Sequence, residues 1–494
     1  MPARSPEMSR YTETERKFDV DEATVSPSFD GLATVSRAER SPSQTLDAVY
    51  YDTSAHDLAR HRITLRRRTG GTDAGWHLKL PAGQDSRTEV RLPLEDGNPA
   101  HPQVPDEIRD VVLAIVRDRG LAPVARISTV RDVTMLYGAD GGAVAEFCDD
   151  RVTAGAVGGE EQRWREWELE LTEGADHGLF KPLTRRLLDA GARPAGHGSK
   201  LARVLGTPTE ETPAAPDDPV HRAVAEQVAE LIAWDRAVRS DVYDSVHQMR
   251  VTTRKIRSLL QSSEGAFGIT DDSWVLGELR ELAGVLGVAR DAEVLAERYE
   301  HALDGLPDDL VRGLVRERLV EGAKRRYQTG WKRSLAAMRT PRYFRLLDAL
   351  EELTTAGPST EPGDEQADLT IASAYKRVRK AAKKASEVEE AGEHADEALH
   401  KIRKRAKQLR YTAAATGQSK VAERAKAIQS LLGDHQDSVV SRSHLSRQAQ
   451  QAHAAGEDTF TYGLLYQQEQ DLAVRCEDQL ADVLEQLEKA VKKA

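Results

Sequence analysis

Charged side chains at alternate positions are the first feature of this sequence that could do chemistry. The stretch RYTETERKFDV (residues 10–20) places Glu13, Glu15 and Lys17 two positions apart. In an extended strand, side chains two positions apart share one face, so these three charges would lie together. Grouped carboxylates can bind a hard divalent cation, and neighbouring Lys or Arg can bind a phosphorylated anion. For any single strand of this kind, a solvated outer face is the ordinary explanation and outweighs a binding site.

The same alternation recurs in later segments. It involves Arg66 and Arg68, Lys79 between two leucines, Arg87, Glu89 and Arg91, Glu146, Cys148 and Asp150, and Glu166, Glu168 and Glu170. Basic residues concentrate on some segments and carboxylates on others, which favours the interior of a closed barrel over a set of unrelated wet faces. Mg²⁺ typically takes one or two protein carboxylates plus phosphate oxygens, so Glu168 and Glu170 are suitable ligands. A Gly-rich P-loop is absent, which disfavours an ordinary NTPase.

Strands are the elements that would position these residues. Strand character is found in TLRRR (64–68), WHLKLP (76–81), RTEVRLPL (87–94), RDVTMLY (131–137), AVAEFCDDRV (143–152) and WREWELELT (164–172). Residues 106–120 read as one amphipathic helix ending at Gly120. Many antiparallel strands with few helices indicate a barrel or a sandwich.

The second half of the chain has helical character and repeats itself. A linker rich in Pro, Thr and acidic residues (206–218) precedes it, and a polar loop (354–368) interrupts it. Residues 246–260 match 399–413, and residues 282–295 match 428–441 in the same order. We therefore expect an α+β multidomain protein whose helical region, residues 219–490, consists of two related bundles at about 219–350 and 369–490.

Each repeat carries a basic stripe. Positions i, i+3, i+7 and i+10 of a helix fall within an arc of roughly 80°. The stripes are His247, Arg250, Arg254 and Arg257 in one repeat and His400, Arg403, Lys407 and Arg410 in the other. Neither 247–257 nor 400–410 contains an acidic residue, and a third acid-free basic run, with Lys376 and Arg379, lies at 375–385. A solvated face is the ordinary explanation of one stripe, but its repetition favours an anion site.

The N-terminal motifs resemble the CYTH superfamily, the triphosphate tunnel metalloenzymes. ETERKF is similar to the ExExK signature, and LRRR, HLKLP, RTEVR, AEFCDDRV, WELEL and GSKLARVL follow in the family's order over residues 8–205. The resemblance implies an eight-stranded antiparallel tunnel that binds triphosphate with Mg²⁺ or Mn²⁺. It gives Lys17, Glu13 and Glu15 the catalytic positions, Glu168, Glu170, Asp150 and Glu146 the metal, and Arg66, Arg68, Lys79, Arg91, Arg131 and Lys200 the triphosphate. The insert at 154–166 weakens the match at Asp150.

The helical half resembles the CHAD domain, a helical module that binds inorganic polyphosphate. VHQMRVTTRKIRS and LGVARD are close to its hallmark segments. The resemblance implies polyphosphate binding by the two stripes together with Arg290, Lys376 and Arg379. Gln436 stands where Arg290 stands in the first repeat, so the halves need not bind equally.

Composition limits the partners and the compartment. The 494 residues carry a formal net charge of −11, which argues against bulk attraction to nucleic acid or to anionic membranes. Only Cys148 and Cys476 occur, and no apolar run approaches 18 residues, so we predict a cytoplasmic protein without a disulfide framework, with polyphosphate granules as a candidate location.

We therefore expect metal-dependent hydrolysis of triphosphate or polyphosphate, with inorganic polyphosphate or tripolyphosphate as the partner. The alternatives are an adenylate cyclase or thiamine triphosphatase, a non-catalytic polyphosphate-binding protein, and nucleic-acid binding by the stripes.

Overall fold

The computed structural model describes residues 8–83, 85–94, 102–206, 218–262, 267–270, 272–355, 371–390 and 396–494. Contacts divide the chain into two compact units, residues 1–259 with 337–357 and residues 260–336 with 358–494. Most of the predicted linker (residues 207–217 of it) and of the predicted polar loop (residues 356–368 of it) lies outside the described residues. The division at residues 8–205, 206–218 and 219–490 stays a prediction. No helix within the described ranges is both long and apolar enough to cross a bilayer.

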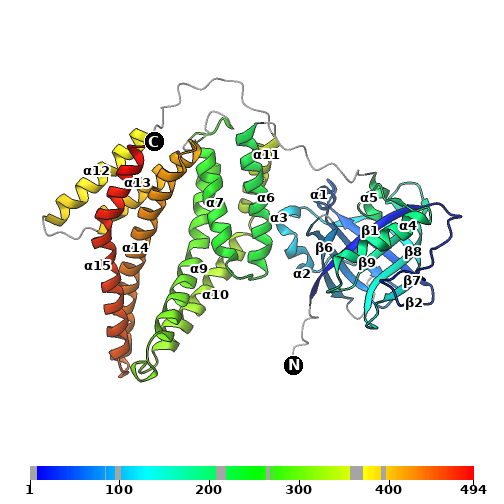
Figure 1. Ribbon diagram of the computed structural model, residues 1–494, viewed down its shortest axis with the longest axis horizontal. Helices are drawn as coiled ribbons and strands as arrows, with labels where there is room; N and C mark the ends of the chain where they lie inside the picture. The colour runs from blue at the N-terminus through cyan, green and yellow to red at the C-terminus, as the bar shows by residue number, and fades with distance from the viewer. Residues whose placement is uncertain are drawn as a thin grey trace. The chain divides into compact units, whose positions relative to one another are not determined.

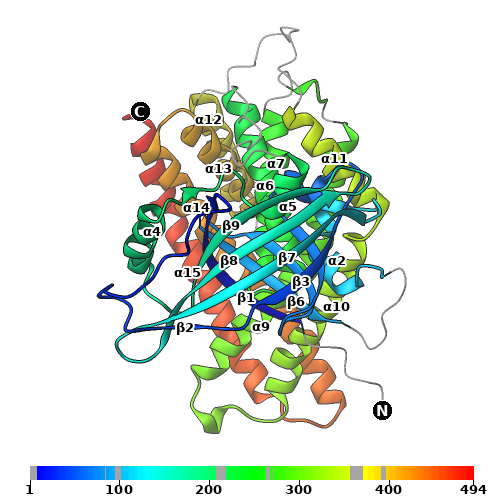
Figure 2. The ribbon, with the colours of Figure 1, turned by 90° about the vertical axis from the view of Figure 1, so that its right-hand side faces the viewer.

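An antiparallel β-barrel forms the N-terminal part of the first unit (Figures 1 and 2). Its strands are β1 (Ser9–Val20), β2 (Arg37–Arg40), β3 (Gln44–Asp52), β4 (Thr64–Thr69), β5 (Gly75–Pro81), β6 (Ser86–Pro93), β7 (Ala122–Tyr137), β8 (Ala143–Ala156), β9 (Gln162–Leu171) and β10 (Arg193–Pro194). Eight of them close in the order β1-β6-β5-β4-β3-β7-β8-β9, while β2 and β10 pair outside this ring. The predicted eight-stranded antiparallel barrel is confirmed.

Strand β1 closes the barrel by pairing with a different neighbour along each half. Its first half pairs with β6, with Glu13 opposite Arg87, and its second half pairs with β9, with Lys17 opposite Glu168. Because side chains alternate along every strand, this register turns the charged residues of the sequence to the inside. Phe18 and Val20, on the other face of β1, pack outside the barrel with Trp167 and with α4 (Phe180–Asp189).

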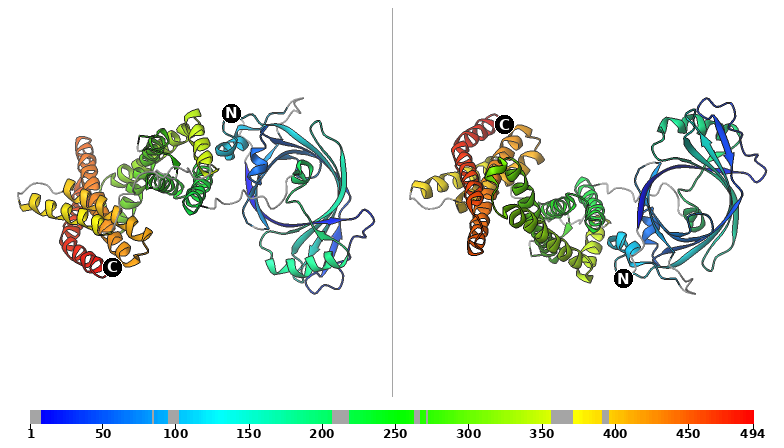
Figure 3. Two further views of the ribbon diagram at one scale, coloured as in Figure 1. Left: turned by 90° about the horizontal axis from the view of Figure 1, so that it is seen from above. Right: turned by 90° about the horizontal axis from the view of Figure 1, so that it is seen from below.

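A short helix, α5 (Lys200–Leu205), lies inside one end of the barrel (Figure 3). Ser199 caps its N-terminus by accepting a hydrogen bond from the Ala202 backbone N–H. Leu201 and Val204 pack against an apolar part of the interior. That part is formed by Ala48, Tyr50, Ala125, Ile127, Val152, Ala154 and Trp164. Hydrophobic packing of α5 therefore places its first residue, Lys200, beside the charged part of the interior.

The predicted helix at 106–120 is wrong as a single element. The structure has two short helices, α2 (Asp106–Val111) and α3 (Leu113–Val116), interrupted at Val112. Arg117 then has φ 56°, which ends the helical path before Gly120. Apolar periodicity identified the buried face correctly, since Ile108, Val111 and Leu113–Val116 are buried, but it does not report a break in the backbone.

The helices of the first unit include α1 (Asp57–Arg60), α6 (Pro219–Arg239), α7 (Ser245–Ser262, of which the unit holds the part up to Leu259) and α11 (Pro341–Thr355). Asp218 caps α6 by accepting hydrogen bonds from the backbone N–H groups of Val220 and His221. Helices α6 and α11 pack together. Asp235 of α6 pairs with Arg239 at 2.6 Å and accepts a hydrogen bond from the Tyr343 hydroxyl of α11 at 2.8 Å.

The second unit is helical (Figure 1). It contains α9 (Trp274–Asp304), η2 (Asp308–Leu310), η3 (Glu317–Glu321), α10 (Gly322–Ala337, up to residue 336), α12 (Ile371–Glu390), α13 (Asp396–Ala415), α14 (Ser419–Ala454) and α15 (Phe460–Val491). One core joins α12, α13, α14 and α15, and another joins α9 and η3 to α14 and α15. Gly330 allows α10 to cross α9, because a Cβ there would lie 2.7 Å from the Ala289 backbone nitrogen.

Candidate functional site

The charged part of the barrel interior encloses a chamber of about 740 Å³. Its charged lining consists of Glu13, Glu15, Lys17, Arg66, Arg68, Asp73, Lys79, Arg87, Arg91, Arg131, Glu146, Glu168, Glu170 and Lys200. Every tunnel residue predicted from the sequence lines this chamber except Asp150, which lies buried behind Arg131 and Lys200. The barrel thus gathers onto one surface charges that are up to 187 positions apart (Glu13 to Lys200).

Lys200 is surrounded by three buried carboxylates. Its Nζ lies 2.8 Å from Asp150, 2.7 Å from Glu166 and 2.8 Å from Glu168. The oxygens of these carboxylates lie within 4.8 Å of one another, a spacing that could also hold a metal ion. Although burial alone would lower it, these carboxylates raise the pKa of Lys200 well above its usual value. The ammonium therefore takes the position that a cation would take in this carboxylate group.

The hairpin between β8 and β9 explains the position of Asp150. Both strands extend past the predicted segments, and the residues counted as an insert form their ends and a short turn. Asp150 pairs directly with Glu166, as Cys148 does with Glu168 and Glu146 with Glu170. Arg131 donates to Asp150 at 2.8 and 2.6 Å and also contacts Glu168. The longer hairpin keeps Asp150 on the inner face.

Lys17 contacts carboxylates on two neighbouring strands of the barrel, β1 and β9. Its ammonium lies 2.9 Å from Glu15 and 2.5 Å from Glu168. Although burial alone would raise it, Lys17 and Lys79 lower the pKa of Glu15 to about 2. Burial lowers the pKa of Lys17, but Glu15 and Glu168 outweigh it and raise this pKa. While these two carboxylates contact it, Lys17 is held in its charged form.

A second set of carboxylates includes two, Glu146 and Glu170, that have no such cation among the described residues. Glu15, Glu170 and Glu146 face one another across β1, β9 and β8. Among the described residues, Glu146 and Glu170 form no ion pair. Burial, followed by the charge of Glu13, raises the pKa of Glu170 to about 7. The carboxylates of Glu13, Glu15, Glu146 and Glu170 thus supply oxygen donors, which are the ligands that Mg²⁺ and Mn²⁺ prefer. The type of ligand in this set is therefore suited to either ion.

The opposite side of the chamber is basic. Arg66 on β4 donates to the Tyr50 hydroxyl at 3.3 Å, and although burial would raise it, Arg66 lowers the pKa of that hydroxyl. Burial, together with Arg66 and Arg131, lowers the pKa of Arg68 to about 9. Arg87 lies 4.0 Å from Glu15 and donates to the Gly198 carbonyl at 2.8 Å. Several guanidinium groups that repel one another in one enclosed space favour the entry of an anion.

A second cavity, of about 460 Å³, adjoins the chamber. It shares Glu15, Lys17, Thr64, Arg87 and Ser199 with the chamber. Residues around β10 and the start of α5, including His197 and Leu201, line its other side. Lys17 and Arg87 therefore stand where the two cavities meet.

The basic stripe of the second unit lies on α13, against α14. Arg403 donates to the Gln429 backbone carbonyl at 3.3 Å, and Arg410 donates to the Gln429 side chain at 3.0 Å. Lys407 and Arg410 lie over the Tyr411 ring at 5.6 and 5.5 Å. His400 is exposed. The stripe is thus a set of basic side chains that neighbours hold on one helix face.

The other predicted anion-binding residues of the helical region are distributed over three helices. His247, Arg250 and Arg257 are half-buried on α7, and Arg254 is exposed there. Lys376 and Arg379 are exposed on α12. Arg290 on α9 pairs with Glu293 at 2.9 Å, so an anion would compete with that carboxylate.

Several residues of the site have no role in the sequence-based prediction. Glu89 and Glu166 lie within the alternation, and His77 shares a face with Lys79, so this pattern could have included them. Tyr50 and Asp73 give no such signal, because strand β3 was not recognised and Asp73 lies in the turn before β5.

Comparison with known proteins gives two domain families. Residues 12–188 match the CYTH domain, and residues 222–446 match the CHAD domain. Uncharacterized proteins from two strains of Mycobacterium tuberculosis are 63% identical over 514 aligned positions, covering 100% of both chains.

Two solved structures are similar at lower identity. PptA from Streptomyces chartreusis has 18% identity and a TM-score of 0.43, covering 54% of this chain and 98% of that one. The CHAD domain from the plant Ricinus communis has 21% identity and a TM-score of 0.39, covering 54% and 90%. The domain matches, together with the closed barrel and the helical region that follows it, show that this chain belongs to the proteins that join a CYTH domain to a CHAD domain.

Proposed function

We propose that the barrel hydrolyses phosphoanhydride bonds of inorganic triphosphate or polyphosphate with Mg²⁺ or Mn²⁺, and that the helical domain binds inorganic polyphosphate. One observation carries the proposal: a single chamber has basic side chains beside two carboxylates, Glu146 and Glu170, for which the described residues provide no ion pair. An ordinary polar interior would pair these charges throughout, whereas a metal-bound polyanion needs both surfaces.

The basic wall would hold the substrate. Arg66 and Arg68 line the chamber on β4, and Arg91 and Arg131 line it on β6 and β7. Arginine forms forked hydrogen bonds that suit the paired oxygens of a phosphoryl group. Lys17 and Lys79 contact Glu15 and Glu13. Their ammonium groups can turn to phosphate oxygens when those carboxylates engage a divalent cation.

Glu13, Glu15, Glu146 and Glu170 would hold the metal. Glu168 and Asp150, also predicted as ligands, are engaged with Lys17, Arg131 and Lys200, which favours a positioning role for them. When bound, the ion supplies charge neutralisation for the phosphoryl oxygens and can lower the pKa of water. The chain's own contribution is to place the polyanion, the carboxylates and a water molecule in one chamber.

Direct attack by water is favoured over a covalent intermediate. Cys148 is the thiol on the inner face of β8, beside Glu146. Burial raises the pKa of this thiol well above its usual value, so it is not a thiolate nucleophile. Hydrolysis therefore requires no covalent role from the protein.

The helical domain would capture polyphosphate through its stripes. Arg403, Lys407 and Arg410 lie on one face of α13, and the Tyr411 ring beside them is already in contact with Lys407 and Arg410, which leaves it less available for stacking of a base. A base-free polyanion therefore fits this surface better than single-stranded nucleic acid does.

Substrate choice tests the catalytic part of the proposal. We expect the full chain with Mg²⁺ or Mn²⁺ to release phosphate from tripolyphosphate faster than from ATP or thiamine triphosphate. Formation of cyclic AMP, or a preference for thiamine triphosphate, would assign the barrel to one of the alternative activities. Polyphosphate binding without any release would leave a binding protein.

A further inference from the structure

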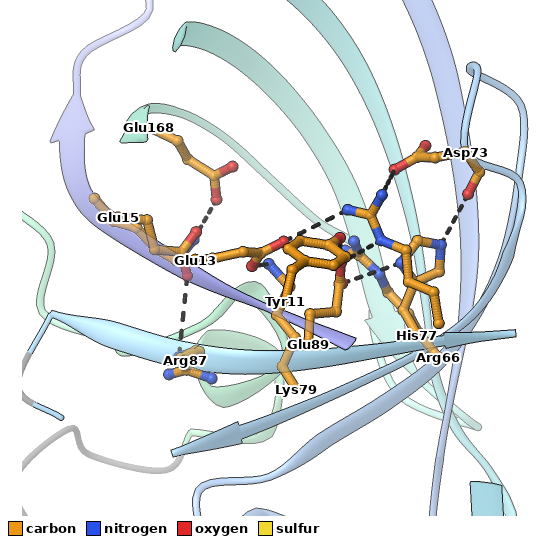
Figure 4. Close-up of polar contacts among 12 residues, drawn as sticks. Tyr11, Glu13, Glu15, Arg66, Asp73, His77, Lys79, Arg87, Glu89 and Glu168 are labelled. Carbon is orange, nitrogen blue, oxygen red and sulfur yellow. Dashed lines mark hydrogen bonds and ion pairs between the residues drawn. The ribbon is translucent and has the colours of Figure 1, made fainter. Parts of the chain in front are cut away.

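Glu89 is a buried carboxyl group between three side chains at the basic end of the chamber (Figure 4). Its Oε1 lies 3.0 Å from Nδ1 of His77. Its Oε2 accepts hydrogen bonds from the Tyr11 hydroxyl and from Nε of Arg91. Arg91 lies over the Tyr11 ring at 4.3 Å and reaches Glu13 and Asp73, each at 3.5 Å. Glu89 thus supports an arginine that lines the chamber.

The hydrogen bonds determine how many protons the His77–Glu89 contact holds. Nε2 of His77 lies 2.9 Å from the Asp73 backbone carbonyl, which can only accept, so Nε2 carries a hydrogen. Nδ1 and Oε1 would repel each other as two lone pairs, and therefore one proton lies between them. The pair is either a neutral imidazole with a carboxylic acid or an imidazolium with a carboxylate. Both forms have the same net charge.

The surroundings distinguish these two forms. Arg66, Arg68 and Lys79 lie on β4 and β5 around His77, and burial followed by these cations lowers its pKa to about 2. Glu89 faces His77 and Lys79 of β5, Tyr11 of β1 and Arg91 of β6. Burial, followed by the charge of Glu170 on β9, raises the pKa of Glu89 to about 8. Charge repulsion and desolvation both favour the neutral form.

We propose that His77 holds Glu89 as a neutral carboxylic acid, and that this pair positions Arg91 without cancelling its charge. An ionised Glu89 would form a buried ion pair with Arg91 and neutralise it. A neutral Glu89 accepts the Arg91 hydrogen bond, while the guanidinium charge stays directed at Glu13, Asp73 and the chamber. His77 and Glu89 are therefore positioning residues, and their effect on phosphate rests on the proposed function.

Thermal unfolding of the full chain between pH 4.5 and 8 tests the protonation state. Glu89→Gln imitates the acid, because its amide can donate to Nδ1 and its carbonyl can accept from Arg91. In the folded wild type, Glu89 keeps its proton up to about pH 8, whereas the unfolded chain loses it near pH 4.5. The folded state then binds more protons, so wild-type stability relative to Glu89→Gln falls as pH rises through this window. A relative stability that rises with pH would mean that the pair holds no proton between Nδ1 and Oε1 and would overturn the proposal, while the infrared spectrum below decides which of the two groups holds that proton.

Binding of inorganic tripolyphosphate, measured by calorimetry at pH 7, tests the positioning of Arg91. We expect Glu89→Gln to bind within about twofold of wild type and Glu89→Ala to bind about tenfold more weakly, since only the amide keeps the hydrogen bond to Arg91. Equal weakening by both variants would contradict the positioning role. Glu160→Gln, at an exposed position, is the matched control.

An infrared difference spectrum detects the protonation of Glu89 directly and does not depend on a measurement of stability. The wild-type spectrum minus the Glu89→Gln spectrum at pH 6 should contain one carboxylic-acid band, because the acid form of Glu170 is present in both proteins and cancels. Absence of that band from the difference would overturn the assignment. If wild type binds no tripolyphosphate, the proposed function fails, while the unfolding and infrared results still decide the state of Glu89.

Discussion

At the scale of single residues, the site depends on which carboxylates already have a cation. Asp150, Glu166 and Glu168 have Lys200, whereas Glu146 and Glu170 lack an ion pair among the described residues. The two groups lie on the same pair of strands, so alternation alone cannot distinguish them. We therefore propose that Asp150, Glu166 and Glu168 have a structural role and that Glu146 and Glu170 bind metal.

Lys200→Met should destabilise the barrel. It leaves three buried carboxylates without their ammonium partner, which costs about 3–5 kcal/mol at neutral pH. In wild type, burial raises the pKa of Glu168, but Lys17 and Lys200 lower it well below its usual value. The wild-type advantage therefore exists above the ordinary glutamate pKa and shrinks as pH falls below it. Thermal unfolding at pH 7 and pH 4 measures both effects.

The exposed Lys181 on α4 provides the control, as Lys181→Met. A second variant, Lys200→Met with Glu166→Gln, should recover part of the loss because it removes one uncompensated charge. If Lys200→Met melts like wild type at pH 7, the ammonium does not hold this carboxylate group together.

At the scale of elements, period-two alternation predicted six strands and the inner face of the barrel. β4, β5 and β6 begin and end within about one residue of the predicted segments. β7 starts at Ala122, nine residues before its predicted start, because two of the buried positions in its first half are Ala125 and Thr129, which give a weak apolar signal. Spacing could not predict that α5 lies inside the barrel, nor which residues contact Lys200. Both depend on how β8, β9 and α5 meet in space. Local pattern identifies a face, but register and closure determine the neighbours.

Helix α13 carries a prediction of its own. Arg403→Ala with Arg410→Ala should weaken binding of long-chain polyphosphate and reduce the dependence of log Kd on log salt by about one to two units, because two phosphate contacts are lost. Lys401→Ala with Arg405→Ala removes two charges from another face of the same helix and should have less effect. Titration at several salt concentrations gives both values. Equal loss in the two variants would indicate non-specific attraction.

At the scale of the whole molecule, one chain carries two proposed sites for the same class of ligand. A polyanion held by one domain is confined near the other, and such tethering raises its effective concentration without any new contact. Tripolyphosphate has only three phosphate groups, so the barrel chamber can take up the whole ligand without the helical domain. The benefit should therefore depend on chain length.

The Arg403→Ala, Arg410→Ala variant tests this coupling. We expect its KM for long-chain polyphosphate to rise by about tenfold or more, while its KM for tripolyphosphate stays at the wild-type value. Steady-state phosphate release with each substrate measures the two constants. An equal change for both substrates would show that the helical domain affects the barrel itself, and no change for either would show that capture does not assist hydrolysis.

The most direct test of the central claim is phosphate release from tripolyphosphate with Mn²⁺ or Mg²⁺, comparing wild type, Glu170→Gln and the exposed control Glu160→Gln. Glutamine keeps the size of the side chain and removes one of four clustered carboxylates, so the barrel should melt no lower without metal. We predict metal-dependent release by wild type and by Glu160→Gln, and a loss of about 100-fold or more in Glu170→Gln. Release by Glu170→Gln at the wild-type rate, with the same metal dependence, would contradict the proposed metal site and the mechanism built on it.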